Sequence, residues 1–335
     1  MEFGVFDHVD ENDLPLHEYY DSRIEFVQLL DKLGFRSYHV AEHHSTPLGM
    51  APSPTVYLSA VARSTQNLRF GPLVFALPLY HPLRLVQEIC MVDQISKGRL
   101  EIGFGRGASP IEAAYFGNDH AEAETTYRNN LERILKALSN GKLDGQDTFN
   151  DAKNVPLQLE PFQKPHPPLW YGVHSVESAE RAAALESNIV SLDTAEETSI
   201  FARAFRSKWQ KKHGSLSNLP LIGLGIFIYV DDDETRALDV ARRAYATWHN
   251  SFNWLFRHHN MAIPKHQRPS TFDGMAAEGR AIAGTPEKVS MFLSERMAVA
   301  NATYLVGQFA FGNLTPDETM KSVRLFGNEV MPELR

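Results

Sequence analysis

Glu42, His43 and His44 form the first of three short stretches whose residue types could carry out chemistry. Imidazole titrates near neutral pH, and a neighbouring carboxylate can fix its tautomer, so the triplet suits acid–base catalysis. A structural role for all three side chains is equally compatible with the pattern. A shared metal ion is disfavoured, because adjacent residues at a strand end point to opposite faces. We therefore expect no metal site here.

The other two stretches could bind an anion. Arg106 lies between Gly105 and Gly107, so the backbone can approach a ligand while the guanidinium forks onto a phosphate or carboxylate. Ser175 and Ser178 mark the predicted start of a helix, where free N–H groups favour phosphate. A solvated turn arginine and an ordinary helix cap explain the same residues. If both stretches hold one phosphate, flavin mononucleotide (FMN) and a sugar phosphate both suit the arrangement.

Short apolar runs must position these residues. They are near-continuous and rich in β-branched and aromatic residues, which is typical of strands buried on both faces of a parallel sheet. The predicted strands are residues 2–6, 37–41, 68–77, 100–104, 169–173, 188–192, 221–230 and 303–310. The three stretches follow the second, fourth and fifth strands, while His8 and His81 follow the first and third and Gln308 lies in the last. Because barrel enzymes carry their chemistry at the C-terminal ends of strands, we expect these side chains on one rim.

Amphipathic stretches alternate with the strands. The predicted helices cover residues 19–33, 83–95, 125–138, 176–185, 200–209, 234–256, 287–297 and 316–330. This alternation predicts an α/β fold of the (β/α)8 or TIM barrel class, with insertions. The alternative, an open doubly wound sheet, usually has a G-x-G-x-x-G turn after its first strand, and here that strand runs into Asp7 and His8.

Two segments exceed a minimal barrel. Residues 140–168 are polar and proline-rich at their end, which predicts a surface excursion that includes a hairpin. Residues 260–284 show almost no periodicity and are expected to form a long loop, such as a lid over the barrel. No linker divides the chain, so residues 1–335 are expected to form a single domain.

Composition restricts the partners. The 335 residues have a net charge of −8, which disfavours nucleic acid, and Cys90 is the single cysteine, so no intrachain disulfide forms. No stretch reaches the roughly 18 apolar residues of a membrane span, and the first residues do not resemble a signal peptide. We expect a cytoplasmic protein without a membrane segment.

The same motifs resemble those of bacterial luciferase-like flavin-dependent monooxygenases over nearly the whole chain. MEFGVFDH at the start, AEHH at 41–44 and LPLYHPLR at 77–84 are similar to the ends of that family's first three strands. DQISKGRLEIGFGRG at 93–107 is the most specific match, followed by YFG at 115–117. AGTPEKV at 283–289 and LFGNEVMPELR at 325–335 resemble the last helices.

The resemblance implies a flavoprotein oxidoreductase that uses reduced FMN and O2, through a C4a-hydroperoxyflavin, to oxidise a small and largely apolar substrate such as an aldehyde or ketone. It implies His43 as the catalytic base. By the same resemblance, cofactor-binding residues are Leu73, Val74, Gly105, Arg106, His174, Ser175 and Ser178, and substrate-pocket or supporting residues are Glu42, His44, His81 and Ser109. A cis peptide bond is expected between Leu73 and Val74.

The sequence departs from the light-emitting relatives at two positions. They carry a cysteine where this chain has Gly105, which we expect to enlarge the pocket, and a large residue where it has Ser109. Light emission from a long-chain aldehyde is therefore one of several oxygenations open to this chain, beside hydroxylation, Baeyer–Villiger insertion and oxidative cleavage.

Nothing resembles a nicotinamide-binding module, so a separate NAD(P)H:flavin reductase is expected as partner. The resemblance also predicts a homodimer through helices near the first strands. Two alternatives stay open: a deazaflavin-dependent dehydrogenase on the same barrel, and a non-catalytic flavin-binding protein.

Overall fold

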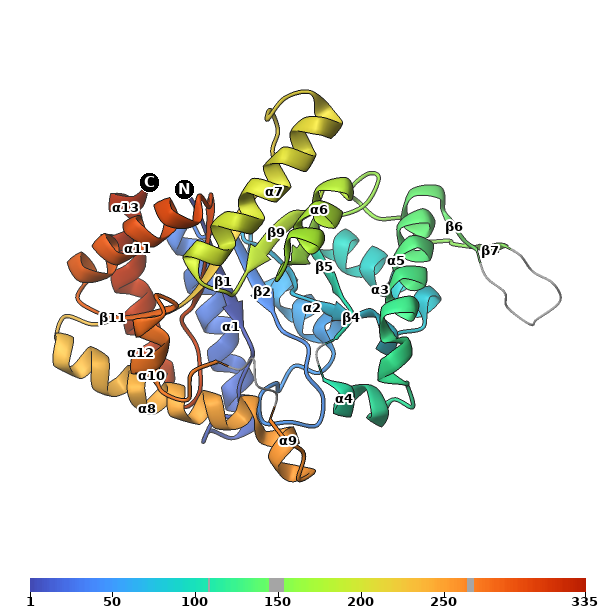
Figure 1. The fold of residues 1–335 in the computed structure, drawn as a ribbon. Helices are drawn as coiled ribbons and strands as arrows, with labels where there is room; N and C mark the ends of the chain where they lie inside the picture. Colours follow the sequence, from blue (N-terminus) through green and yellow to red (C-terminus); the bar gives the residue numbers. More distant parts are fainter. Residues whose placement is uncertain (108, 145–153, 264–267) are drawn as a thin grey trace.

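Parallel strands form a barrel surrounded by helices in the computed structural model, which describes residues 1–107, 109–144, 154–263 and 268–335 (Figure 1). The barrel strands run in the order β3-β2-β1-β12-β10-β9-β8-β5-β4, and a bridge between Phe70 and Leu100 joins β3 to β5. The strands are β1 (Glu2–Asp7), β2 (Ser37–Val40), β3 (Arg69–Pro72), β4 (Phe75–Ala76), β5 (Ile102–Gly105), β8 (Leu169–Gly172), β9 (Asn188–Ser191), β10 (Ile222–Val230) and β12 (Tyr304–Gln308), with β11 (Ala281–Gly284) paired to β10. This arrangement confirms the predicted TIM barrel and rules out the open doubly wound sheet.

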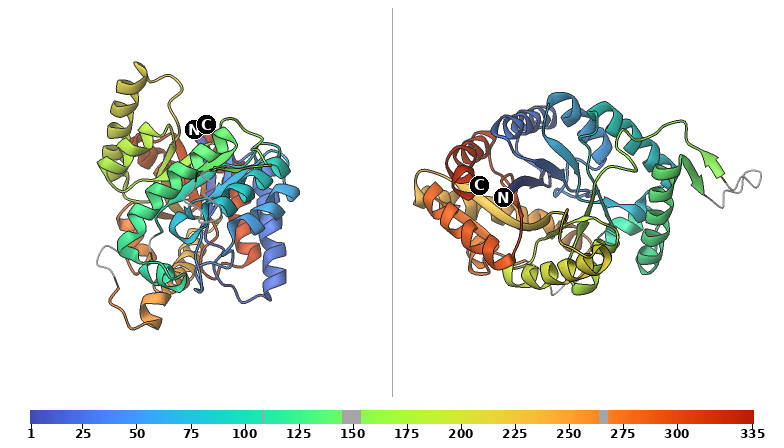
Figure 2. Two further views of the ribbon diagram at one scale, coloured as in Figure 1. Left: turned by 90° about the vertical axis from the view of Figure 1, so that its right-hand side faces the viewer. Right: turned by 90° about the horizontal axis from the view of Figure 1, so that it is seen from above.

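The helices cover the outside of the barrel, as the view from above shows (Figure 2). They are α1 (Leu16–Leu33), α2 (Pro54–Ser64), α3 (Pro82–Ser96), α4 (Pro110–Tyr115), α5 (Ala123–Asn140), α6 (Val176–Ala184), α7 (Ala195–His213), α8 (Glu234–Phe252), α9 (Trp254–His258), α10 (Phe272–Ala277), α11 (Pro286–Ala300), α12 (Pro316–Leu325) and α13 (Met331–Leu334). The predicted helix 234–256 is divided at Asn253, and the predicted strand 68–77 is divided between β3 and β4. Each element predicted outside the two inserted segments is present, with ends shifted by a few residues.

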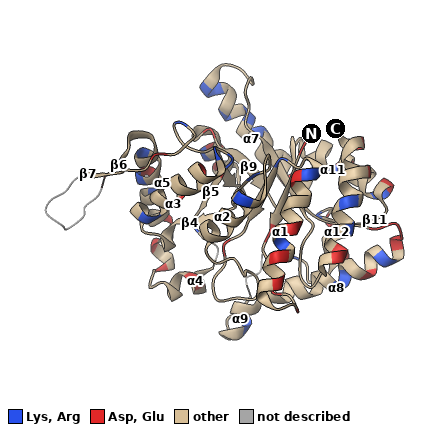
Figure 3. Ribbon diagram, turned by 180° about the vertical axis from the view of Figure 1, so that it is seen from behind, with Lys and Arg blue, Asp and Glu red and all other residues tan. Residues whose placement is uncertain are grey.

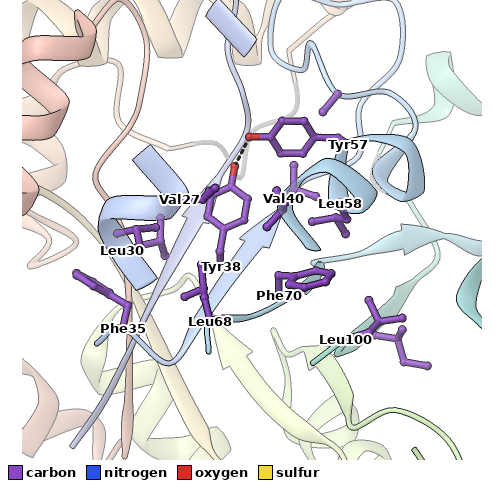
Figure 4. Close-up of a cluster of buried hydrophobic side chains, with 14 of the residues drawn as sticks. Val27, Leu30, Phe35, Tyr38, Val40, Tyr57, Leu58, Leu68, Phe70 and Leu100 are labelled. Carbon is purple, nitrogen blue, oxygen red and sulfur yellow. Dashed lines mark hydrogen bonds between the residues drawn. The ribbon is translucent and has the colours of Figure 1, made fainter. Parts of the chain in front are cut away.

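The largest part of the core lies between the strands and the helices. Val27 of α1, Tyr38 of β2, Leu58 of α2 and Phe70 of β3 are almost fully buried there (Figure 4). Burial of an aliphatic side chain of this kind contributes about 1.5–3 kcal/mol. The hydroxyl groups of Tyr38 and Tyr57 lie 3.2 Å apart, so these two buried polar groups are partners of each other.

The lower interior of the barrel is filled by a polar layer. Glu101 has no exposed side-chain surface, and it accepts hydrogen bonds from Trp170 Nε1 at 2.7 Å and Arg69 Nε at 2.7 Å. Next to it, His39 Nε2 lies 2.9 Å from the hydroxyl of Tyr304. Because these side chains fill the interior, a ligand must bind at the mouth of the barrel.

The structure confirms the prediction for one of the two segments that exceed a minimal barrel and contradicts it for the other. In residues 140–168, β6 (Lys142–Asp144) and β7 (Asn154–Pro156) pair antiparallel, so the predicted hairpin is confirmed, while its tip at 145–153 lies outside the described residues. The expectation that residues 260–284 form only a loop is wrong, because α10 and β11 lie there. Phe272 and Met275 of α10 are buried against α8. These elements are too short for a hydrophobic period to be recognised in the sequence, and α10 also contains Gly274.

The outer surface carries both signs of charge. Figure 3 shows acidic and basic residues interspersed on α1, α8 and α12. None of the helices in the described ranges is long and apolar enough to cross a membrane.

Candidate active site

Two adjoining cavities open at the C-terminal ends of the barrel strands. One, here called the histidine cavity, has a volume of about 170 Å³ and the other, the anion cavity, about 410 Å³. They share Val74, Arg106 and Gly107. The histidine cavity is lined by Phe6, Ala41, Glu42, His43, His44, Leu73, Val74, Ala76, Pro78, Leu79, Arg106, Gly107, Ser109, Glu112, Ala113 and His120. The anion cavity is lined by Val74, Phe104, Gly105, Arg106, Gly107, Glu124, Tyr127, Tyr171, Gly172, His174, Ser175, Ser178 and Arg181.

His43 is held by a carboxylate that the sequence analysis did not single out. Its Nδ1 lies 3.2 Å from Oε1 of Glu112, and the same oxygen accepts a hydrogen bond from the backbone N–H of His44 at 2.7 Å. Burial alone would raise the pKa of Glu112, but the hydrogen bond and charge of His43 and the N–H of His44 outweigh it and lower that pKa. Glu112 is therefore ionised at neutral pH, and it leaves Nε2 as the ring nitrogen that His43 can use toward a ligand.

Local structure explains how Glu112 reaches this position. Ser109 is the N-cap of α4 and accepts a hydrogen bond from the Glu112 N–H at 3.2 Å, and Pro110 occupies the first turn. Ser109-Pro110-Ile111-Glu112 has the spacing of a capping box, in which the glutamate would turn back to the N-cap. Here the carboxylate points to the histidines instead, so the sequence pattern alone does not indicate that Glu112 contacts His43.

Glu42 and His44 form a second pair beside the first. His44 Nε2 lies 2.8 Å from Glu42 Oε1, while Glu42 Oε2 accepts hydrogen bonds from the Tyr80 hydroxyl at 2.9 Å and the Ala76 N–H at 3.1 Å. Burial, together with the charge of Glu42, raises the pKa of Tyr80, so the tyrosine stays protonated and donates. Glu42 thus connects the ends of β2 and β4 and orients His44. Among the described residues, no group of three or more His, Cys, Asp or Glu side chains is arranged to hold a metal ion.

His8, at the end of β1, lies against His43. The two rings stack with centroids 5.8 Å apart, and His8 also makes an edge contact with Trp248, with ring centroids 5.7 Å apart. Burial, and then the charges of His43 and Arg268, hold the pKa of His8 well below its usual value. His8 is therefore neutral at physiological pH and contributes an uncharged, flat surface next to His43.

The anion cavity contains the predicted phosphate-binding groups. Arg106 is exposed between the two cavities and has no hydrogen bond or ion pair with any residue that the structure describes. Ser175 is the N-cap of α6, and it forms a capping box with Ser178. Ser178 Oγ accepts hydrogen bonds from the backbone N–H groups of His174 at 3.2 Å and Ser175 at 3.0 Å. The positive end of the α6 dipole and a free guanidinium therefore face the same space.

Two further predicted residues line this cavity. His174 is largely exposed, and its Nδ1 lies 2.9 Å from Oδ2 of Asp193. Gly105 ends β5, and a Cβ at this position would lie only 2.4 Å from Cγ2 of Val74. The expectation that Gly105 enlarges the pocket is therefore wrong, because Val74 occupies that space. The peptide bond between Leu73 and Val74 is cis, as predicted.

His81 is the predicted site residue that the structure does not bring to either cavity. It is exposed at the residue before α3, whereas Pro78 and Leu79 of the preceding turn line the histidine cavity instead. His120, which was not among the predicted site residues, lies in a short turn after α4 and lines the histidine cavity. No strand end signals its position, because it belongs to an insertion between β5 and α5.

Comparison with known proteins places the chain in a family. The sequence pattern of luciferase-like monooxygenases matches residues 1–308. The uncharacterized protein y4wF of Sinorhizobium fredii is 37% identical over 99% of this chain and 96% of its own length. The oxygenase component of flavin-dependent trigonelline monooxygenase from Acinetobacter baylyi is 30% identical over 56% of this chain and 53% of its own length.

Solved structures share the fold. The monooxygenase RslO1 from Streptomyces bottropensis superposes with a TM-score of 0.86 at 21% identity, over 100% of both chains. Coenzyme F420-dependent tetrahydromethanopterin reductase from Methanopyrus kandleri has a TM-score of 0.72 at 18% identity, over 100% of this chain and 99% of its own. From the match over residues 1–308, together with the barrel, the chain belongs to the luciferase-like monooxygenase family.

Proposed function

We propose that the chain is the oxygenase component of an FMN-dependent monooxygenase that acts on a small organic substrate. The observation that carries the proposal is the common wall of the two cavities. On one side of Val74, Arg106 and Gly107 lie the groups that suit a phosphate, and on the other side lies His43. A phosphorylated cofactor with a flat ring fits this division, and a sugar phosphate would leave the histidine cavity without a function.

The phosphate end would be bound by Arg106 and the beginning of α6. Arg106 has no described partner to give up, so binding an anion there does not break an existing ion pair. The hydroxyl of Ser175 points to Ser178 Oγ at 3.4 Å, a long contact that it can exchange for a phosphate oxygen. Gly105 and Val74 then form a smooth edge beside the ring, because glycine leaves room for the valine side chain.

Reduced FMN, when bound, would supply the electrons that activate O2 for transfer of one oxygen atom to the substrate. His43 would act as base at its free nitrogen, because Glu112 occupies Nδ1 and accepts that proton's hydrogen bond. His8 and the apolar side chains of Phe6, Leu73 and Leu79 would limit the access of water to this nitrogen.

Two variants test the proposal. Arg106→Ala should weaken FMN binding by about 10- to 100-fold in a calorimetric titration, which is the range for a lost charge-assisted hydrogen bond. His43→Ala should leave FMN affinity within about twofold and lower product formation by roughly 100-fold or more. Unchanged FMN affinity in Arg106→Ala would remove the phosphate assignment, and full activity in His43→Ala would remove the base.

The deazaflavin coenzyme of structural relatives is the second candidate for the cofactor. With that coenzyme, the chain would be a dehydrogenase that transfers hydride and does not react with oxygen. Parallel titrations of the unmodified protein with FMN and with F420 distinguish the two, since the proposal requires the tighter complex with FMN. As an oxygenase component, the chain would receive reduced FMN from a separate NAD(P)H:flavin reductase, as the name of the Acinetobacter relative implies for that protein.

A homodimer is part of the proposal. Val56 of α2 and Met91 of α3 are 72% and 52% exposed, and Phe162 is 55% exposed. Phe162 adjoins α3, because the side chain of Gln94 donates a hydrogen bond to the carbonyl of Glu160 at 3.0 Å. These apolar side chains on neighbouring elements favour burial against a second copy of the chain.

A further inference from the structure

Arg268 lies at the mouth of the barrel, close to the proposed base. Its guanidinium carbon is 5.9 Å from the centroid of the Trp248 ring, a cation–π distance. Trp248 in turn contacts His8 at 5.7 Å, and His8 stacks on His43 at 5.8 Å. Nη1 of Arg268 donates a hydrogen bond to the carbonyl of Leu192, just beyond the end of β9, at 3.3 Å. The guanidinium is therefore anchored on the rim that carries the other site residues.

No carboxylate forms an ion pair with Arg268 within the described part of the chain, although the charges of Asp193 and Glu278 act on it from a longer distance. The Leu192 carbonyl is its one described hydrogen-bond acceptor, and no ion pair joins it to a described residue. Residues 264–267, which precede it and are not described, have the sequence Pro-Lys-His-Gln and contain no acid. Burial, and then the charge of Arg280, lower the pKa of Arg268 to about 10, so it is still charged at neutral pH. A partly buried cation without an ion pair gains free energy when it binds an anion.

Arg280 provides an internal comparison. Its Nη2 donates to the same Leu192 carbonyl at 2.9 Å, but its Nη1 also pairs with Glu278 at 3.0 Å. Two guanidinium groups thus meet at one carbonyl, and of the two only Arg280 forms an ion pair with a described carboxylate. This difference distinguishes Arg268 as a group prepared for a ligand.

Two other polar groups at the mouth also lack partners in the described ranges. Nε1 of Trp248 is buried without a hydrogen bond. The residue Gln308, at the end of β12, is 2% exposed, and its side chain has no described hydrogen bond. Tyr304 and Val306 face the barrel interior, so Gln308, two residues further, faces the mouth. A polar ligand group among these side chains would satisfy donors that the protein leaves unused.

We propose that Arg268 binds a carboxylate of the substrate at the mouth of the barrel. Arg268 adjoins the ends of β9 and β1, whereas Arg106 follows β5, so the two arginines serve different ligands. The substrate is then an organic acid whose apolar body occupies the space beside His43. This inference rests on the proposed function, since it assigns the FMN phosphate to Arg106, and it narrows the substrate class from small organic molecules to carboxylic acids with an apolar body.

The test measures binding to the FMN complex with matched probes. Benzoate and hexanoate are titrated calorimetrically beside their uncharged amides, benzamide and hexanamide. The expected result is that at least one acid binds about tenfold or more tightly than its amide, and that Arg268→Met removes this preference while FMN affinity stays within about twofold. Equal affinities of acid and amide in the unmodified protein would overturn the inference.

Further outcomes separate this inference from the proposed function. If Arg268→Met weakens FMN binding but not the preference for acids, Arg268 faces the cofactor and the inference fails. If the unmodified protein does not bind FMN, the proposed function fails instead. A preference for acids that persists in Arg268→Met with normal FMN binding also overturns the inference.

The control variants are chosen because Arg268 and Arg280 donate hydrogen bonds to the same Leu192 carbonyl. In Arg268→Met the Leu192 carbonyl keeps its hydrogen bond from Arg280, so no buried acceptor is left unpaired and the variant should fold. Arg280→Met removes a neighbouring charge that already has a carboxylate, and it should retain the preference for acids. Arg268→Lys keeps the charge without the planar fork and should give an intermediate preference. Loss of the preference in Arg280→Met but not in Arg268→Met would contradict the assignment.

Discussion

Replacement of Glu112 by alanine tests how the protein orients the proposed base. One carboxylate oxygen holds both the His43 ring, at 3.2 Å, and the His44 N–H, at 2.7 Å. A hydrogen bond to a charged group contributes about 1.5–3 kcal/mol, which corresponds to roughly a 10- to 100-fold change in the population of the oriented ring. We therefore expect Glu112→Ala to lower any His43-dependent rate by about that factor, with FMN affinity unchanged. Glu112→Gln, which keeps an acceptor oxygen, should restore part of the loss.

The assay need not wait for the substrate. Long-range proton–nitrogen NMR spectra of histidine-labelled protein report which ring nitrogen of His43 carries the proton, and this assignment should become mixed in Glu112→Ala. The reasoning is refuted if both the tautomer of His43 and the rate are unchanged in the variant. Folding is checked by thermal unfolding, because the carboxylate also holds the His44 backbone.

Three further predictions concern other parts of the molecule. Gly105→Ala should weaken FMN binding by roughly tenfold in a fluorescence titration, because its Cβ would lie 2.4 Å from Cγ2 of Val74; unaltered affinity would mean that Val74 moves freely. Burial alone would raise the pKa of Asp231, but hydrogen bonds from Arg236 and other partners lower it from 3.8 to about 2. The carboxylate therefore stabilises the fold above about pH 4, and this contribution disappears as the pH falls through about 2. In urea unfolding, Asp231→Asn should be less stable than the unmodified protein at neutral pH and equal to it at the acid end; a pH-independent difference would contradict the ion pairing. Val56→Asp should shift the chain from dimer to monomer in sedimentation, and a dimer that persists would place the interface elsewhere.

The sequence was sufficient for the barrel because the strands are buried on both faces. Their near-continuous apolar runs and the amphipathic helices between them leave few other arrangements. It was not sufficient for β11, whose residues Ala-Ile-Ala-Gly gain their place from pairing with β10 and not from a pattern of their own. The same holds for α10, where Phe272 and Met275 are buried only because α8 lies beside them.

In the candidate site, the order of elements in the sequence predicted the residues that lie at strand ends. It did not predict the site residues that come from inserted segments. His43, Arg106 and Ser175 directly follow strands, so their meeting at one rim follows from the topology. Glu112 and Arg268 come from the segments after β5 and before β11, and their positions depend on tertiary contacts that no local spacing encodes. His81 follows β4 by sequence, yet the turn at Leu77–Leu79 carries it away from the cavities.

The most direct test of the central claim is the reaction of the protein's FMN complex with oxygen. Photoreduced FMN is mixed anaerobically with excess protein, and oxygenated buffer is then added in a stopped-flow absorbance experiment. We expect flavin reoxidation to be slower than for free reduced FMN, and Arg106→Ala to move the rate toward that of free flavin. Reoxidation at the rate of free FMN in the unmodified protein would contradict the claim that this barrel holds reduced FMN for oxygen chemistry.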